Sequence, residues 1–238
     1  EMARAIQKVV TDANITTKFV NVAMPENQVY TKVIEMPVLS DKELSSAIFW
    51  EAEQNIPVPL STITLAWNVL KRPQKAVGTE KMQVLMVGAP TILVNKYQKI
   101  LSMAGLSVNV LETEILSIIR ALVLSENFPS TLIVNIGSVS TSLAIVRDGI
   151  MIFTYSIPIG GMAINRAIST DFGLTPSQAE EYKKVYGISK EAFGEKIGNA
   201  TEPILNSILT EVKKALVFYS NKYKDDKLDD IELDAPPK

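Results

Sequence analysis

The sequence has 238 residues, of which 47% are hydrophobic and 21% charged, a composition typical of a globular protein with one large domain or two small ones. It contains no cysteine and no histidine, which excludes disulfides, Ser-His-Asp triads and histidine-ligated zinc. The net charge of −2 does not suggest a nucleic-acid-binding surface. No stretch has the apolar length of a membrane-spanning helix or of a secretory signal, so we expect a cytoplasmic protein.

The first part of the chain predicts a helix followed by two strands and a second helix. Residues 3–14 have amphipathic periodicity, and residues 19–24 and 29–36 are strand-like, separated by a turn at 25–27. Ser40 and Glu43 form a capping box, which predicts a helix start. That helix should end near Asn55, because Pro57 and Pro59 follow.

The next segment completes a module of mixed helix and strand. Residues 63–70 and 82–88 predict strands joined by the polar segment 71–80, and residues 92–104 predict a helix with Gly105 as its left-handed cap. We therefore expect residues 19–105 to form an α+β module able to fold by itself.

The centre of the chain predicts a hairpin. A short strand at 108–111 and a helix at 113–127 lead into strands at 131–134, 141–147 and 150–157. Asp148 and Gly149 separate the last two strands, and Asp-Gly is a strong signal for a type I′ turn.

Three helices and an acidic tail are predicted after the hairpin. The first covers 162–172 and stops at Gly173, and the second starts at Thr175 with Pro176 and Gln178 in capping positions and ends at Gly187. After a weaker helical stretch at 190–196, a long amphipathic helix should run from 203 to 223. Residues 225–238 hold six acids and two lysines, a net charge of −4, so we expect a mostly exposed terminus from 224 onward.

The loop between the strands at 131–134 and 141–147 is the first candidate site. Its small residues (Gly137, Ser138, Val139, Ser140 and Thr141) would allow backbone N–H groups to approach an anion such as phosphate. From the residues alone, an ordinary polar hairpin loop is the commoner interpretation. Likewise, Glu180 and Lys183 on their helix are more often a solvated ion pair than a binding site.

Four segments taken together resemble the PilM family of type IV pilus assembly proteins, relatives of FtsA in the actin-like ATPase superfamily. They are residues 50–59 (Trp-Glu-Ala-Glu-Gln-Asn-Ile-Pro-Val-Pro), 133–149, 156–161 and 179–187. The resemblance implies an α/β fold of actin-like, ribonuclease H-like domains with a small inserted α+β subdomain. Residues 1–17 and 106–128 would belong to subdomain 1A, 18–105 to the insertion, 129–224 to the second domain and 225–238 to the acidic tail.

The resemblance also implies ATP and Mg²⁺ as cofactors. Phosphate contacts are expected from the loop at 137–141 with Asn135, Gly160 and Gly161, and ribose contacts from Glu180 and Lys183. Asn135 stands where the family has Asp, so it would hold Mg²⁺ only through water and cannot act as a base. The family's first phosphate loop and its glycine-rich adenosine loop are absent from this sequence, so we expect a fragment that binds ATP weakly.

The implied function is a cytoplasmic component of the pilus assembly platform, held at the inner membrane through its partners. The expected partner is the N-terminal cytoplasmic segment of a PilN-like membrane protein, with other platform components and motor ATPases beside it. We expect no catalytic residue and at most a weak ATPase. Alternatives are a superfamily ATPase or phosphotransferase, which would need a carboxylate base, and an FtsA-like division protein, which the acidic tail disfavours because it cannot lie on anionic lipid.

Overall fold

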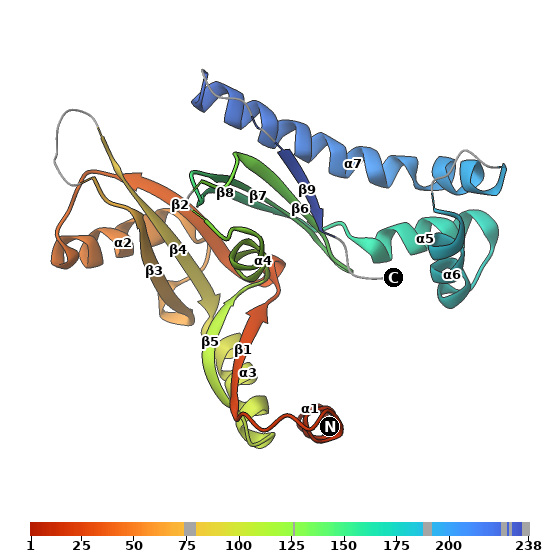
Figure 1. Ribbon diagram of the computed structural model, residues 1–238, viewed down its shortest axis with the longest axis horizontal. Coiled ribbons are helices and arrows are strands. Elements are labelled where there is room, and N and C mark those ends of the chain that lie inside the picture. Colours follow the sequence, from red (N-terminus) through yellow and green to blue (C-terminus); the bar gives the residue numbers. More distant parts are fainter. Residues whose placement is uncertain (74–79, 126, 188–191, 225–227, 229, 235–238) are drawn as a thin grey trace. The chain divides into compact units, whose positions relative to one another are not determined.

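The computed structural model describes residues 1–73, 80–125, 127–187, 192–224, 228 and 230–234. The chain divides into two compact units, Glu1–Leu122 and Val123–Lys238, each with its own sheets and core. Figure 1 shows the elements of both units in sequence colours. No described helix is both long and apolar enough to cross a membrane.

The first unit contains a two-stranded parallel sheet covered by helices. β1 (Phe19–Met24) pairs with β5 (Ser107–Thr113), and α1 (Met2–Asp12) and α3 (Thr91–Met103) contribute to the core beside it. α3 ends as predicted: Gly105 has φ of +79°, its N–H donates to Ser102, and the Leu106 N–H donates to Leu101. The buried residues of this core are Ala3, Leu101, Ala104 and Leu106.

A separate three-stranded antiparallel sheet completes this unit. Its order is β2 (Tyr30–Met36), β4 (Met82–Pro90), β3 (Ile63–Lys71), with short 3₁₀ turns at Glu26–Gln28 and Leu60–Thr62. The strands expected in one module at 19–105 therefore belong to two sheets, because β1 pairs with β5 outside that range. The predicted polar segment at 71–80 lies largely outside the described residues.

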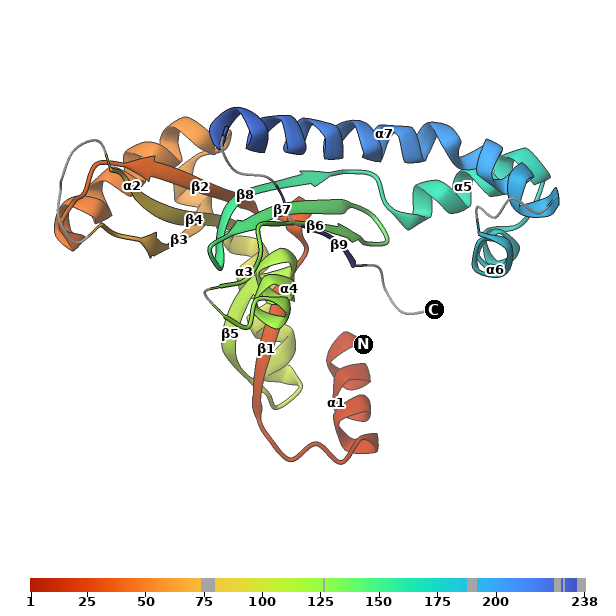
Figure 2. The same cartoon turned by 45° about the horizontal axis from the view of Figure 1, so that its top comes forward.

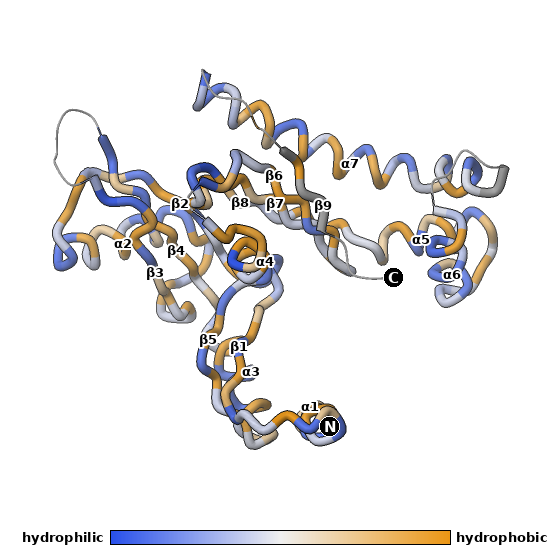
Figure 3. Tube along the Cα trace, in the orientation of Figure 1, coloured by the Kyte–Doolittle hydropathy of each residue, from blue (hydrophilic) through white to orange (hydrophobic). Residues whose placement is uncertain are grey.

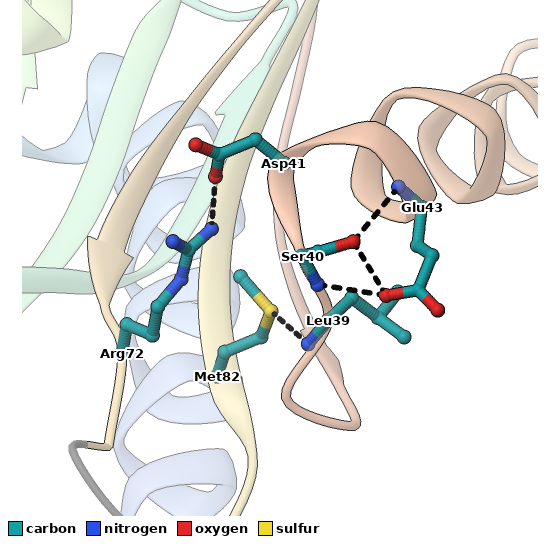
Figure 4. A network of polar contacts seen from close by, with 6 residues as sticks. All are labelled: Leu39, Ser40, Asp41, Glu43, Arg72 and Met82. Carbon is teal, nitrogen blue, oxygen red and sulfur yellow. Dashed lines mark hydrogen bonds and ion pairs between the residues drawn. The ribbon is translucent and has the colours of Figure 1, made fainter.

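α2 (Asp41–Asn55) packs on one face of this sheet and begins at the predicted capping box. Figure 4 shows Ser40 Oγ accepting from the Glu43 N–H at 3.4 Å, while Glu43 Oε2 accepts from the Ser40 N–H at 2.9 Å. Arg72, just after β3, pairs with Asp41 in the first turn. Between helix and sheet lie Ile34, Met36, Leu44, Ile48, Ala52, Ile56, Met82, Val84 and Met86.

The second unit is built on a four-stranded sheet of order β8-β7-β6-β9. β6 (Thr131–Ile136), β7 (Thr141–Arg147) and β8 (Ile150–Ile157) are antiparallel neighbours, and β9 (Asp230–Asp234) adds parallel to β6. The predicted Asp-Gly turn is confirmed, since Asp148 and Gly149 have φ of +52° and +72°.

Three helices connect β8 to β9. α5 (Gly161–Phe172) ends at Gly173 in the left-handed conformation, and α6 (Pro176–Tyr186) starts with the predicted Thr175 and Gln178 capping box. α7 (Ala192–Lys222) runs along the sheet, as both views show (Figures 1 and 2), with Ala215 and Tyr219 buried against it. Hydrophobic and hydrophilic colours recur along α7 in Figure 3, as expected of an amphipathic helix whose apolar residues return every three to four positions.

Three predicted boundaries were wrong. α7 is one helix rather than two, with Pro203 inside it, because both halves pack: Ile197 against α5 and α6, and Tyr219 against the sheet. The helix predicted at 113–127 is α4 (Glu114–Leu122), followed by a turn in which the Phe128 N–H donates to Ser125, just before Pro129.

The third correction concerns the acidic tail. Residues 230–234 form a strand, β9, that was not predicted. Their sequence alternates acidic and apolar residues, Asp-Ile-Glu-Leu-Asp, which is a strand pattern that the net charge obscured. The parallel pairing gives the outer backbone groups of β6 hydrogen-bond partners.

Candidate functional site

The candidate phosphate loop connects β6 to β7 as a tight turn of residues 137–140, called here the β6–β7 loop. The Gly137 N–H donates to the Ser140 carbonyl at 2.9 Å. Asn135, at the end of β6, is paired in register with Ser142 of β7 and with Asp234 of β9. Asn135 therefore lies on an inner strand of the sheet, two residues before the loop begins.

The β6–β7 loop also caps the N-terminus of α5. Its Gly137 carbonyl accepts from the Gly161 N–H at 2.9 Å, and its Ser138 carbonyl accepts from the Met162 N–H at 2.8 Å. Two of the N–H groups that a helix N-terminus can offer to an anion are thus used within the protein.

This close approach gives Gly160 a structural reason to be glycine. A Cβ atom at Gly160 would lie 2.5 Å from the Gly137 oxygen and 2.8 Å from the Ser138 carbonyl carbon. A Cβ at Gly161 would meet nothing nearer than Lys183 Nζ at 3.6 Å. The two adjacent glycines therefore differ: only the first is required by the packing of one backbone segment on another.

Three other donors of the β6–β7 loop have no partner among the described residues. Among the described residues, no hydrogen bond involves the backbone N–H groups of Ser138, Val139 or Ser140, and the Val139 side chain is 58% exposed. The Thr141 hydroxyl, by contrast, is buried and donates to the Ile159 carbonyl at 2.8 Å. Three successive N–H groups are the donors with which this loop could hold a phosphate.

A lysine from α6 lies beside the loop. Lys183 Nζ is 2.7 Å from Glu180 Oε2 and, being 3.6 Å from the Cβ position of Gly161, borders the first turn of α5. Glu180 and Lys183, both on α6, were predicted to belong to the site. They lie next to Gly161 because α6 packs against α5. An ammonium group here adds a positive charge to the loop's N–H donors.

Glu180 is held ionised by its neighbours. Its hydrogen bonds with Lys183 and then Asn165 lower its pKa to about 2. Asn165 Nδ2 on α5 donates to the same oxygen as Lys183, while Lys184 Nζ lies 3.5 Å from the other oxygen, Oε1. Glu180 Oε1 is thus the oxygen left more open for a ligand hydroxyl.

Asn165 and Lys184 were missed by the sequence analysis. Lys184 could have been found, because it follows Glu180 at i,i+4 spacing on one helix face. Asn165 could not, since its place beside Glu180 depends on how α5 packs on α6. Its Oδ1 is buried and has no hydrogen-bond partner in the described part of the chain.

The described residues contain no cluster of three or more histidine, cysteine or acidic side chains able to hold a metal ion. A hydrated Mg²⁺ next to bound phosphate would need only one water-mediated contact from the protein, which the amide oxygen of Asn135 can make. The residues around the loop therefore suit a phosphate anion better than an isolated cation.

Outside the site, Glu26 is a buried carboxylate in the first unit, only 4% exposed. Burial raises its pKa, an effect offset in part by the nearby Thr113 and Thr31 hydroxyls and the Ile115 N–H. Its Oε2 accepts no hydrogen bond from the described residues. The sequence had placed Glu26 in an ordinary turn.

Solved structures of other proteins have a fold similar to that of almost the whole chain. A solved structure of the PilM-PilN type IV pilus biogenesis complex matches with a TM-score of 0.83 at 26% identity, covering 98% of this chain and 67% of that one. MreB5 of Spiroplasma citri bound to ADP matches with a TM-score of 0.50 at 15% identity, covering 90% and 57%, which shows the fold alone. The fold is therefore actin-like.

The family model for type IV pilus assembly protein PilM matches residues 1–235. Since this match covers nearly the entire chain, the protein belongs to the PilM family.

Proposed function

We propose that this protein is an actin-like component of the type IV pilus assembly platform that binds a nucleotide and docks the N-terminal cytoplasmic segment of a PilN-like membrane protein. The observation that carries the proposal is the similarity of 98% of the chain to PilM in a PilM-PilN complex. The protein would lie in the cytoplasm at the inner membrane through this partner, with other platform components and motor ATPases nearby.

The proposed nucleotide is ATP with Mg²⁺, bound at the β6–β7 loop. The N–H groups of residues 138–140 and the ammonium of Lys183 would hold the phosphates, and Glu180 Oε1 would accept from a ribose hydroxyl. Mg²⁺ would neutralise phosphate charge, with Asn135 contacting one of its waters. Gly137, Gly160 and Gly161 keep the loop and the start of α5 close together.

A role as adaptor rather than as efficient enzyme follows from the proposed site. The carboxylate that the described contacts place beside the start of α5 is that of Glu180, and it is already bound to Lys183 and Asn165. Phosphoryl transfer requires a group that orients or deprotonates the nucleophile. We therefore assign the nucleotide a structural or regulatory role.

The pairing of β1 with β5 refines the proposed domain limits. Residues 18–24 and 91–105 would join 1–17 and 106–128 in the 1A-like part, leaving about residues 25–90 as the inserted subdomain. Residues 129–224 would form the second domain, to which β9 adds a strand.

A depression between α1 and α3 is the proposed docking groove. It has a volume of about 500 Å³ and a largely apolar lining, with Lys96 and Lys99 among its residues. Ile92, 82% exposed, lies in its wall. A short apolar segment that orders on binding could fill such a groove.

The experiment is fluorescence anisotropy with a labelled peptide from the N-terminus of a PilN-like protein. We expect saturable binding of about micromolar strength, as is typical of short segments that order on binding. Ile92→Ser should weaken binding, whereas Val185→Ser, the same kind of apolar-to-polar change at an exposed position of α6, should not. Absence of binding to the folded chain would reject the docking role.

A further inference from the structure

The two edges of the three-stranded sheet differ in how they are protected. β2 carries Lys32 and Glu35, charged residues of the kind that blunt an edge strand. β3, at the other edge, has no proline or glycine and carries a charge only at its last residue, Lys71. Alternate backbone groups along β3 point away from β4, so over residues 63–70 this is an uncharged edge whose outer hydrogen-bonding groups have no strand partner among the described residues.

Aromatic side chains flank this edge on the face that α2 covers. Trp67 of β3 and Phe49 of α2 meet edge to face, with ring centroids 6.5 Å apart. Phe49 is 50% exposed and Trp50, next to it, is 69% exposed. Large exposed aromatic groups beside an open edge are typical of a binding surface.

The charge beside these aromatic residues is negative. Glu53 lies one helical turn after Phe49, is exposed, and makes no ion pair with the residues that the structure describes. In contrast, Asp41 is paired with Arg72, and Glu43 caps the helix. An arginine or lysine side chain could contact both the aromatic faces and Glu53.

We propose that the outer edge of β3 binds an extended segment of a partner protein as an additional strand, with cationic side chains directed at Phe49, Trp67 and Glu53. Backbone hydrogen bonds to β3 would supply affinity, and the aromatic and acidic side chains would select the sequence. This site is separate from the β6–β7 loop and does not rest on the proposed function.

A second copy of the chain fits this edge less well. Antiparallel pairing of β3 with itself would place the two α2 helices side by side on one face of the joined sheet. Residues 41–55 carry four acids and one lysine, so like charges would be brought together. Charge complementarity therefore favours a cationic partner segment.

The test uses a labelled, capped peptide in which arginine and threonine alternate, titrated into the full chain. One control peptide has glutamate in place of arginine, and another has proline in place of threonine, which removes backbone donors. We expect binding of the first peptide only. Glu53→Lys and Phe49→Ala should each weaken it by about tenfold or more, whereas the matched changes Glu202→Lys and Val185→Ala in the second unit should leave it unchanged.

Two results would overturn the proposal. Equal binding of the proline peptide would show that the interaction is unspecific charge attraction. Failure of the arginine peptide to bind the folded chain, together with a concentration-dependent dimer that Phe49→Ala abolishes in sedimentation equilibrium, would assign the edge to a second copy.

Discussion

Gly160 and Gly161 offer a direct test of the contact between the β6–β7 loop and α5. We predict that Gly160→Ala destabilises the second unit, whereas Gly161→Ala does not. The backbone of Gly160 has φ of −148° and ψ of −166°, which any residue can adopt, so the effect is steric rather than conformational.

The size of the effect follows from what the new methyl group meets. At Gly160 it would lie 2.5 Å from the Gly137 oxygen and 2.8 Å from the Ser138 carbonyl carbon and oxygen, all backbone atoms that cannot rotate away. Overpacking of this kind costs about 1–3 kcal/mol. At Gly161 the nearest atom is the end of the flexible Lys183 side chain, and Ala in place of Gly in a helix can contribute up to about 1 kcal/mol. The free energies of unfolding of the two variants should therefore differ by about 1–4 kcal/mol.

Urea unfolding followed by far-ultraviolet circular dichroism measures this difference. Tryptophan fluorescence would not, because Trp50 and Trp67 both lie in the first unit. Hydrogen exchange at Gly161 and Met162 locates the effect, since their N–H groups donate to the loop. If Gly160→Ala were as stable as Gly161→Ala, with unchanged exchange, the loop could not be capping α5 as described.

Three further predictions concern the site and the long helix. Asn135→Asp should strengthen the Mg²⁺ dependence of ATP binding in calorimetric titrations, because it adds a charge near the metal; an unchanged dependence would argue against Asn135 facing the metal. Lys183→Met should raise the pKa of Glu180 from about 2 towards its usual value, because Lys183 is the main cause of the shift. The ionised Glu180 stabilises the native fold above about pH 4.5, and this stabilisation is lost as pH falls towards 2. In the variant, Glu180 should become protonated at a higher pH, so its stabilising effect should also be lost at a higher pH. NMR titration of the Glu180 carboxyl carbon measures this pKa. Pro203→Ala should raise the free energy of unfolding by about 1–3 kcal/mol, since it restores a helical hydrogen bond and removes a ring clash, and an unchanged urea midpoint would contradict this.

Local features were predictable from the sequence because each depends on residues only a few positions apart. Ser40 with Glu43 and Thr175 with Gln178 form their capping boxes, and Gly105 and Asp148 have the positive φ expected of a helix cap and a type I′ turn. In the capping boxes, side chains bind helix N–H groups that have no partner within the helix, whereas Gly105 and Asp148 stand where the backbone needs a residue that tolerates positive φ. The order of such segments along the chain then carried the family resemblance.

Long-range pairing was not predictable in the same way. The partner of β1 is β5, more than eighty residues later. Nothing in the sequence of Phe19–Met24 shows that this strand pairs with β5 and not with the adjacent strand β2. β9 was hidden by its charge, and the continuity of α7 through Pro203 depends on tertiary contacts at both ends. Tertiary packing can override a local helix-breaking preference when it stabilises the helix by more than the proline costs.

The candidate site shows why a glycine predicted from a binding motif needs structural interpretation. Gly160 was expected to contact phosphate, but the nearest backbone to it is the β6–β7 loop, so its replacement would disturb the protein even without a nucleotide. Loss of ATP binding on Gly160→Ala would therefore not identify a phosphate contact. Two kinds of group can report on phosphate directly. The N–H groups of residues 138–140 have no described backbone partner, and the Lys183 ammonium borders Gly161 from a different helix. A charge change at Lys183 that weakens ATP binding while α5 remains protected from exchange would separate a ligand contact from a structural one.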